Sequence, residues 1–155
     1  MRHRILQQEL PILIVEDDAL QGLDVAEMLK EAGASVIGPI SDLEAAVGVA
    51  RTKACSAAII DFRLGAFNAI PLGEELHQRQ IPFLIHTGYD CLGVLPSTWR
   101  GCRVIIKPAA SEELVWTLAA LVRWRRAARK PLTGQPAFGN TLDADVTGAP
   151  PKLRR

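Results

Sequence analysis

Four apolar runs of this chain end in residues that could take part in chemistry. The first run leads to Glu16 and Asp17, a later one to Asp61, the next to Thr87 and the last to Lys107. Carboxylates that lie close together repel one another, so a cation or a proton must compensate their charge. An all-oxygen acidic cluster suits Mg²⁺, and an ammonium and a hydroxyl suit phosphoryl oxygens. The set therefore predicts a site for Mg²⁺ and a phosphoryl group, although Asp61 taken alone would equally suit a turn.

The elements that must bring these residues together are short strands alternating with helices. Continuous apolar runs indicate strands at Ile12–Val15, Ser35–Ile37, Ala57–Ile60, Phe83–His86 and Val104–Lys107. Helical patterns run from Asp18 to Gly33, Ser41 to Arg51, Asn68 to Gln80 and Ser111 to Arg129. This alternation implies right-handed crossovers and a parallel sheet. We predict an α/β fold, a flavodoxin-like doubly wound five-stranded parallel sheet in the order 2-1-3-4-5, whose ligands bind beyond the carboxyl ends of the strands.

Several element boundaries carry their own signals. Asp18, Ser41 and Ser111 each begin a helical pattern, as N-cap residues do. Ser41 and Glu44 also have the spacing of a capping box. We expect the glycine–proline pair after Ile37 to stop the second strand.

Composition excludes several classes of function. The chain has 155 residues, 48% of them apolar, and a formal net charge of +1, so neither nucleic acid nor an acidic partner is indicated. No run approaches the ~20 apolar residues of a membrane span, and the N-terminus lacks a secretory pattern. Cys55, Cys91 and Cys102 form no CxxC pair, which favours reduced thiols and a cytoplasmic protein.

Glu16-Asp17, Asp61, Thr87 and Lys107-Pro108, each at the end of its strand, resemble the site of the response-regulator receiver domain of two-component signalling. The resemblance covers roughly residues 10–128. It implies a signalling phosphoprotein in which Asp61 accepts a phosphoryl group from a sensor histidine kinase or phosphotransfer protein. Thr87 and its loop would then move toward the phosphate.

The resemblance also implies a Mg²⁺ site. Its ligands would be Glu16, Asp17, Asp61 and the backbone carbonyl of Arg63. Asp18 is the rival member of the acid pair, but the usual pair follows the strand directly, and Asp18 then serves as the helix cap.

Three features depart from the family pattern. Val104 stands where receivers often carry an aromatic switch residue, and Gly88 follows Thr87 in place of the commoner alanine. Residues Asp90–Cys102 contain two glycines and a proline, so we expect a loop or a short helical turn that opens easily and changes on phosphorylation. These features resemble an alphaproteobacterial subgroup named for a Phe-Ala-Thr-Gly-hydrophobic-Tyr motif. That resemblance implies kinases of the HWE type.

We expect residues 1–10 to be an N-terminal extension, 11–129 the receiver domain and 130–155 a disordered tail, because proline, glycine and polar residues dominate the tail. The tail is too short for an output domain, so the receiver surface itself would bind an unknown downstream protein. The basic end of the last helix is expected to be solvated, with Trp116 and Trp124 packing and Trp99 in a surface loop.

Other functions are open. A phosphatase of the haloacid-dehalogenase type also uses an aspartate nucleophile and Mg²⁺, but its nucleophile would follow strand one. A nucleotide or flavin site is disfavoured, because acids rather than a glycine-rich loop follow strand one. A degenerate receiver would bind a partner without phosphorylation. We expect no enzyme activity beyond self-phosphorylation and slow autodephosphorylation.

Overall fold

A computed structural model of the chain describes residues 5–6, 11–99 and 102–130. The predicted N-terminal extension, 1–10, and the predicted tail, 130–155, lie almost wholly outside these residues. Among the described helices, none combines the length and the apolar content that a membrane span requires.

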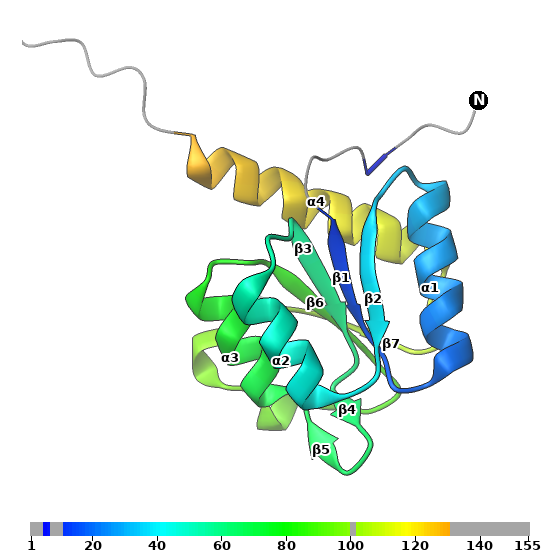
Figure 1. Cartoon of the computed structure of the whole chain (residues 1–155), viewed down its shortest axis with the longest axis vertical. Helices are drawn as coiled ribbons and strands as arrows, with labels where there is room; N and C mark the ends of the chain where they lie inside the picture. Colours follow the sequence, from blue (N-terminus) through cyan, green and yellow to red (C-terminus); the bar gives the residue numbers. More distant parts are fainter. Residues whose placement is uncertain (1–4, 7–10, 100–101, 131–155) are drawn as a thin grey trace, which may run out of the picture.

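Five parallel strands form the central sheet, in the order β2-β1-β3-β6-β7 (Figure 1). Their bounds are β1 Ile12–Val15, β2 Val36–Ile40, β3 Ala57–Ile60, β6 Phe83–Thr87 and β7 Arg103–Ile106. A small antiparallel hairpin is made by β4, Arg63–Leu64, and β5, Phe67–Asn68. The sheet order confirms the predicted 2-1-3-4-5 arrangement of a doubly wound fold.

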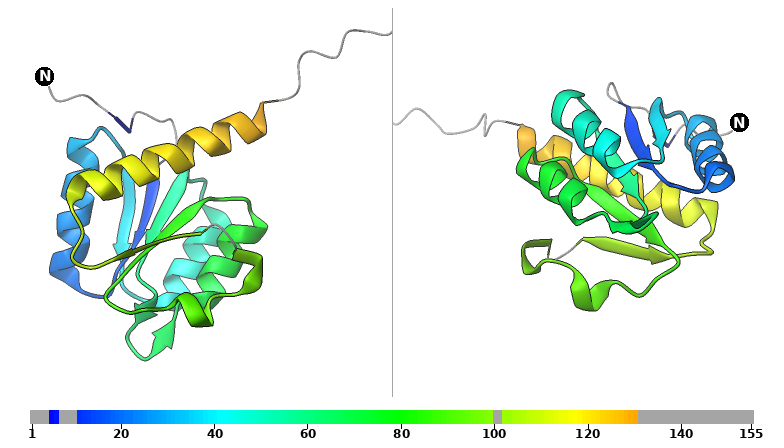
Figure 2. Two further views of the ribbon diagram at one scale, coloured as in Figure 1. Left: turned by 180° about the vertical axis from the view of Figure 1, so that it is seen from behind. Right: turned by 60° about the horizontal axis from the view of Figure 1, so that its bottom comes forward.

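Four α-helices cover the sheet in two layers (Figures 1 and 2). Their bounds are α1 Ala19–Glu31, α2 Leu43–Thr52, α3 Ile70–Gln78 and α4 Ser111–Arg129. The helices α1 and α4 lie on one face and α2 and α3 on the other, as successive right-handed crossovers require.

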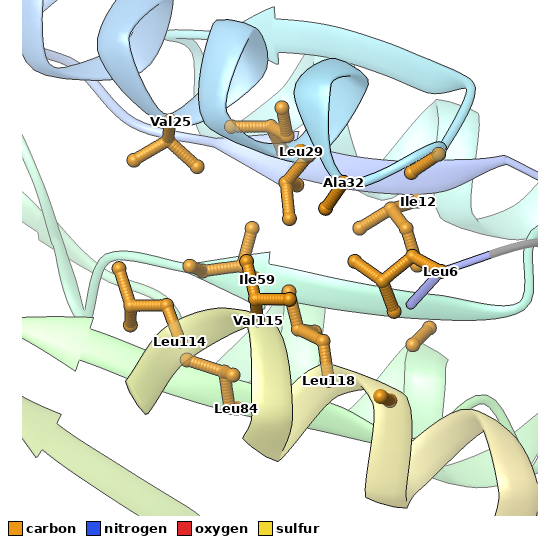
Figure 3. Close-up of a cluster of buried hydrophobic side chains, with 14 of the residues drawn as sticks. Leu6, Ile12, Val25, Leu29, Ala32, Ile59, Leu84, Leu114, Val115 and Leu118 are labelled. Carbon is orange, nitrogen blue, oxygen red and sulfur yellow. The ribbon is translucent and has the colours of Figure 1, made fainter. Parts of the chain in front are cut away.

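Both faces of the three central strands are buried, which explains their continuous apolar runs. Alternate residues point to opposite layers: Ile12 and Ile14 face α1 and α4, whereas Leu13 and Val15 face α2 and α3. Figure 3 shows the first layer, where Leu6 also packs, close to Ile12 and Leu118. The site at the end of the sheet therefore stands on a rigid, double-sided core.

Strand β2 does not stop where we expected. It runs through Gly38 and Pro39 to Ile40, and the pairing shifts there: Leu13 pairs with Ile37 and Val15 with Ile40. The extra residue is a bulge. Because β2 is an edge strand, a proline without an N–H group is tolerated on it.

Of the three N-cap residues predicted from the sequence, the structure confirms one. Asp18 caps α1 as predicted, and its Oδ1 accepts a hydrogen bond from the N–H of Gln21 at 3.0 Å. Helix α2 is capped by Asp42 rather than Ser41, through a 2.8 Å bond from the N–H of Ala45 to Oδ2. The carboxylate of Asp42 takes the place that a serine hydroxyl would fill. Helix α4 begins one residue after Ala110, with no side-chain cap, and Ser111 is its first residue.

Residues 90–102 contain no α-helix where the structure describes them. Two short 3₁₀ turns, Leu92–Val94 and Ser97–Trp99, replace the helix that would connect β6 to β7. This confirms the expected reduced fourth helix. Leu92 and Val94 are exposed, as a loosely held segment would show.

The far end of this segment is better anchored than we expected. Trp99 is only 5% exposed and belongs to the core against α2 and α3. Its ring meets that of Phe83 edge-on, with centroids 5.2 Å apart, and it lies over Gly73 of α3, where an added Cβ would stand 2.2 Å from Trp99 Cη2. A glycine in mid-helix thus makes the room that this indole fills.

Two predictions for α4 are wrong. Trp116 and Trp124 are exposed rather than packed. Arg125, predicted to be solvated, is buried, and its guanidinium donates a hydrogen bond to the carbonyl of Cys55. The helix turns its apolar stripe to the sheet, and position 125 falls on that stripe, next to Val122.

Candidate functional site

Three carboxylates converge at the carboxyl ends of β1 and β3. Glu16 and Asp17 follow β1 directly, and Asp61 follows β3. One ligand oxygen from each lies within 4.8 Å of the other two. The pairing of β1 with β3 fixes this arrangement, since Val15 is in register with Ile60. The structure thus brings together the acids that the sequence placed at two strand ends.

Lys107 supplies the positive charge of the cluster. Its Nζ lies 2.5 Å from Oε2 of Glu16 and 2.9 Å from Oδ2 of Asp61. Lys107 directly follows β7, while Glu16 and Asp61 are buried. An ammonium between two buried carboxylates offsets part of their repulsion.

Burial and charge shift the pKa values of this pair. Burial raises the pKa of the Glu16 carboxyl, Asp61 adds to that rise, and the bonds from Lys107 and from the Asp18 backbone oppose it. For Lys107, burial alone would lower the pKa, but the hydrogen bonds and charges of Glu16 and Asp61 outweigh it, so its pKa is raised. Lys107 therefore stays cationic over the whole physiological pH range.

Thr87, the last residue of β6, is fully buried beside β7. Its carbonyl accepts a 2.8 Å hydrogen bond from the N–H of Lys107, which ties the two strand ends together. Its Oγ1 accepts a long bond, 3.4 Å, from the N–H of Tyr89. The hydroxyl hydrogen is thus free to be donated elsewhere.

Asp17 and Asp18 have different environments. Asp18 is exposed and bonded to the start of α1, whereas Asp17 belongs to the acid cluster and its Oδ2 accepts a 2.8 Å bond from the N–H of Gly65. The geometry agrees with the choice of Glu16 and Asp17 over Asp18. The roles of these residues as metal ligands stay a prediction.

The β4–β5 hairpin was missed at the sequence level, where a helix was expected from Asn68. Its turn contains Gly65 at a positive φ of 60°, and Asn68 Oδ1 instead accepts a bond from the N–H of Ile70 at the start of α3. Arg63, in β4, donates its N–H to Asp61 Oδ1 at 3.1 Å. The glycine inside the run from Arg63 to Asn68 was the signal for a tight turn.

A contact between Arg63 and Tyr89 was also missed at the sequence level. The guanidinium of Arg63 lies over the ring of Tyr89, 4.5 Å from its centroid, a cation–π arrangement. Arg63 is two residues after Asp61, and Tyr89 is two after Thr87. The pair thus joins the segment after Asp61 to the segment after Thr87.

The remaining polar residues near the site are less involved. His86 is half-buried, and its Nε2 has no hydrogen-bond partner among the described residues. Burial lowers the pKa of His86, and the charge of Lys107 lowers it further, so the ring is neutral at pH 7. Val104 stands where receivers often carry an aromatic switch residue, and its side chain is half-buried in β7.

Several solved structures that align with this chain are response-regulator receiver proteins. The solution structure of SdrG from Sphingomonas melonis Fr1 aligns with a TM-score of 0.64 and 29% identity, covering 76% of this chain and 99% of SdrG. A CheY-like receiver domain from Methanospirillum hungatei aligns with a TM-score of 0.68 and 19% identity, over 78% of this chain and 99% of that one. This chain has the fold of a response-regulator receiver domain.

A third solved structure shares this fold. It is the receiver domain of a sensor histidine kinase from Pseudomonas aeruginosa, described with a magnesium ion coordinated in its active-site cleft. It aligns with a TM-score of 0.61 and 22% identity, over 75% of this chain and 99% of that one. In this chain, Glu16, Asp17 and Asp61 form a group of carboxylates that could hold a metal ion.

A curated relative is the transcriptional regulatory protein PdtaR of Mycobacterium tuberculosis, 32% identical over 80 residues. That match takes in 51% of this chain and 39% of PdtaR, so it spans well under half of the length of that relative. No family model matches the chain.

Proposed function

We propose that this receiver domain accepts a phosphoryl group on Asp61 from a phosphohistidine of a sensor histidine kinase or phosphotransfer protein, and changes its partner binding in response. The observation that carries the proposal is the placement of Asp61. Its carboxylate is buried at a strand end, within 4.8 Å of two further acids and 2.9 Å from an ammonium. A fixed oxygen beside a cation is what phosphoryl transfer requires, because positioning and charge stabilisation supply most of its catalysis.

In the transfer, a carboxylate oxygen of Asp61 forms a bond to phosphorus as the P–N bond to histidine breaks. The electron pair of that bond returns to the imidazole ring, and Asp61 becomes an acyl phosphate. Oδ1 of Asp61 is held by the N–H of Arg63 and Oδ2 faces Lys107, so both oxygens are oriented before the donor arrives. Lys107 is placed to hold a phosphoryl oxygen.

Mg²⁺ fits the donor set. Glu16, Asp17 and Asp61 are oxygen donors, the ligand type that this ion prefers, and each carboxylate oxygen keeps a second lone pair beyond its present hydrogen bond. The backbone carbonyl of Arg63 would complete the set of Mg²⁺ ligands that the protein supplies. When bound, Mg²⁺ neutralises charge on the phosphoryl oxygens. Together with Lys107 it would balance an acid cluster that one ammonium compensates only in part.

The acyl phosphate carries about two negative charges, about one more than the carboxylate it replaces, and three phosphoryl oxygens that accept hydrogen bonds. It would form beside the end of β6, where Thr87 is the last residue. The Thr87 hydroxyl has only a long bond from Tyr89, so donating to a phosphoryl oxygen costs it little. Movement of Thr87 would pull on the Tyr89 loop and on the segment that begins at Asp90. A partner that distinguishes the two positions of this segment would read the phosphorylation state.

We propose no turnover of a separate substrate, only self-phosphorylation and slow autodephosphorylation. The test is incubation of the protein with Mg²⁺ and a small phosphodonor, followed by intact-mass measurement and mapping of the modified residue. We expect one phosphoryl group on Asp61, lost in Asp61→Asn and kept in Asp18→Asn. Phosphorylation of an acid directly after β1 would indicate the phosphatase alternative. If no residue is phosphorylated with any divalent metal ion, the protein is a degenerate receiver.

The donor is tested separately. Autophosphorylated histidine kinases, including the HWE type, are mixed with the protein and the loss of label from the kinase is followed. Rapid transfer to wild type but not to Asp61→Asn supports a kinase donor. If only the small phosphodonor phosphorylates the protein, Asp61 is still the acceptor, but the tested kinases are not its donors.

A further inference from the structure

A groove of about 940 Å³ lies at the amino ends of β6 and β7, at the opposite end of these strands from the acid cluster. Its walls come from the end of α3, the start of β6, residues near Trp99 and the last turns of α4. The carboxyl-terminal half of α4 runs past the edge of the sheet (Figures 1 and 2). We call this hollow the basal groove.

The basal groove is apolar, aromatic and basic. Ile81, Phe83 and Trp99 line it and are buried, whereas Trp124, which also lines it, is 64% exposed. Arg129 lies at its rim, and none of the described residues that line it is acidic. An occupant would therefore need both an apolar face and negative charge.

The positive charge extends beyond the rim. Arg123, Arg126 and Lys130 are exposed on the same end of α4. Cations are favourable there because they oppose the negative end of the helix dipole, but nothing acidic is bonded to them among the described contacts. The surface around the groove is thus set up to attract carboxylates.

The chain itself contains a segment of this chemistry directly beyond α4. Residues 131–155 follow the helix end that lines the groove. The tail has two acids, Asp143 and Asp145, and one aromatic residue, Phe138. All three lie within residues 138–146, which also carry Leu142 and Val146.

The linker between α4 and this segment is long enough for the segment to fold back to the basal groove. Seven residues separate Lys130 from Phe138 and can span up to about 24 Å when extended. Such a short tether gives an effective concentration in the millimolar range, so even weak contacts would be occupied.

We propose that residues 138–146 dock in the basal groove of the same molecule. In this proposal Phe138, Leu142 and Val146 contact the apolar lining of the groove, and Asp143 and Asp145 pair with the basic end of α4. The contact covers Trp124, which is otherwise 64% exposed, and it does not depend on phosphorylation of Asp61.

Hydrogen exchange of the full-length protein tests this docking. The informative variant is Asp143→Asn with Asp145→Asn; the matched control, Lys152→Gln with Arg154→Gln, also removes two tail charges but lies outside the segment. We expect the charge-removed variant to exchange about three- to tenfold faster in peptides covering 77–83 and 121–130, the factor expected for two exposed ion pairs. Peptides of β3 serve as an internal reference for folding.

A charge-reversal pair sharpens the result. Arg129→Glu should also speed exchange in residues 138–146, and Asp145→Lys added to it should restore protection. Equal exchange in wild type and the Asp143/Asp145 variant overturns the proposal, as does an equal effect of the control. Protection that grows with protein concentration, with a matching mass increase in light scattering, would assign the groove to a second copy and overturn docking in the same molecule.

Discussion

The ammonium of Lys107 lies 2.9 Å from Oδ2 of Asp61, although 46 residues separate the two along the chain. The same Nζ lies 2.5 Å from Oε2 of Glu16. One cation thus serves two buried carboxylates, with Asp17 as a third acid close by. The site holds more negative charge than its own lysine can balance, which explains why a divalent cation would stabilise it.

The first prediction concerns pH. Burial raises the pKa of Glu16, so the folded state binds a proton more readily than the unfolded chain. The contribution of Glu16 to the free energy of unfolding is fully present below its ordinary pKa of 4.5. This contribution is lost as the pH rises through the pKa of Glu16 in the folded state. Without divalent cations, Glu16→Gln should therefore unfold at higher urea than wild type at pH 7, and the gap should close toward pH 4.5. Glu27→Gln, an exposed change in α1, is the control; a constant gap would contradict the shift.

The second prediction separates Asp17 from Asp18. Asp17→Asn should weaken Mg²⁺ binding about tenfold or more, because a charged ligand of the cluster becomes neutral. Asp18→Asn should leave the affinity unchanged and also keep the cap of α1, since asparagine caps helices as well as aspartate does. Isothermal titration measures both affinities. The reverse order would mean that Asp18 is the ligand.

The third prediction is that Gly73→Ala destabilises the protein by about 1–3 kcal/mol, because the new methyl group would overlap Trp99 and force it to move. Alanine in a helix normally gains up to about 1 kcal/mol over glycine. Gly48→Ala in α2, where nothing lies within 4 Å of the new Cβ, should show that gain. Urea unfolding gives both values.

A double-mutant cycle completes this test. In a Trp99→Ala background the Gly73→Ala change should become neutral or stabilising, because its clash is gone. A penalty that persists without the indole would place the cause elsewhere in α3.

The fourth prediction divides the segment from Asp90 to Cys102. Amides around Leu92–Val94, an exposed turn, should exchange fast, whereas those beside buried Trp99 should be slower. A phosphate mimic with Mg²⁺ should slow only the first part, which adjoins Thr87. Hydrogen exchange with mass spectrometry resolves the halves. Uniform fast exchange would mean that Trp99 does not anchor the segment.

The fifth prediction uses the thiols. Burial, together with Cys91, raises the pKa of Cys102 to about 12. At pH 8 its thiolate is about a thousandfold rarer than that of a thiol with the ordinary value of 9.0. Alkylation of Cys102 should therefore be very slow in the native protein and fast in urea, with buried Cys55 as the reference. Cys102 labelling much faster than Cys55 would show that the segment opens readily.

The sequence alone determined the layout of the domain. Runs such as Ile12–Val15 and Ala57–Ile60 are apolar throughout because both faces of a central parallel strand are buried. Parallel strands end at one edge, so the residue after each run had to meet the others there. The helix cap at Asp18 was also predictable, because capping is a contact within one turn.

The tertiary structure decided what depends on contacts between distant residues. Gly38 and Pro39 can continue β2 only because it is an edge strand with a bulge. Trp99 is core because Gly73 of α3 leaves room for it. Lys107 meets Glu16 and Asp61 across 91 and 46 residues, and Arg63 of β4 meets Tyr89 beyond the end of β6. Local patterns set which residues form strands and helices, but the distances between their side chains arise only when the chain packs.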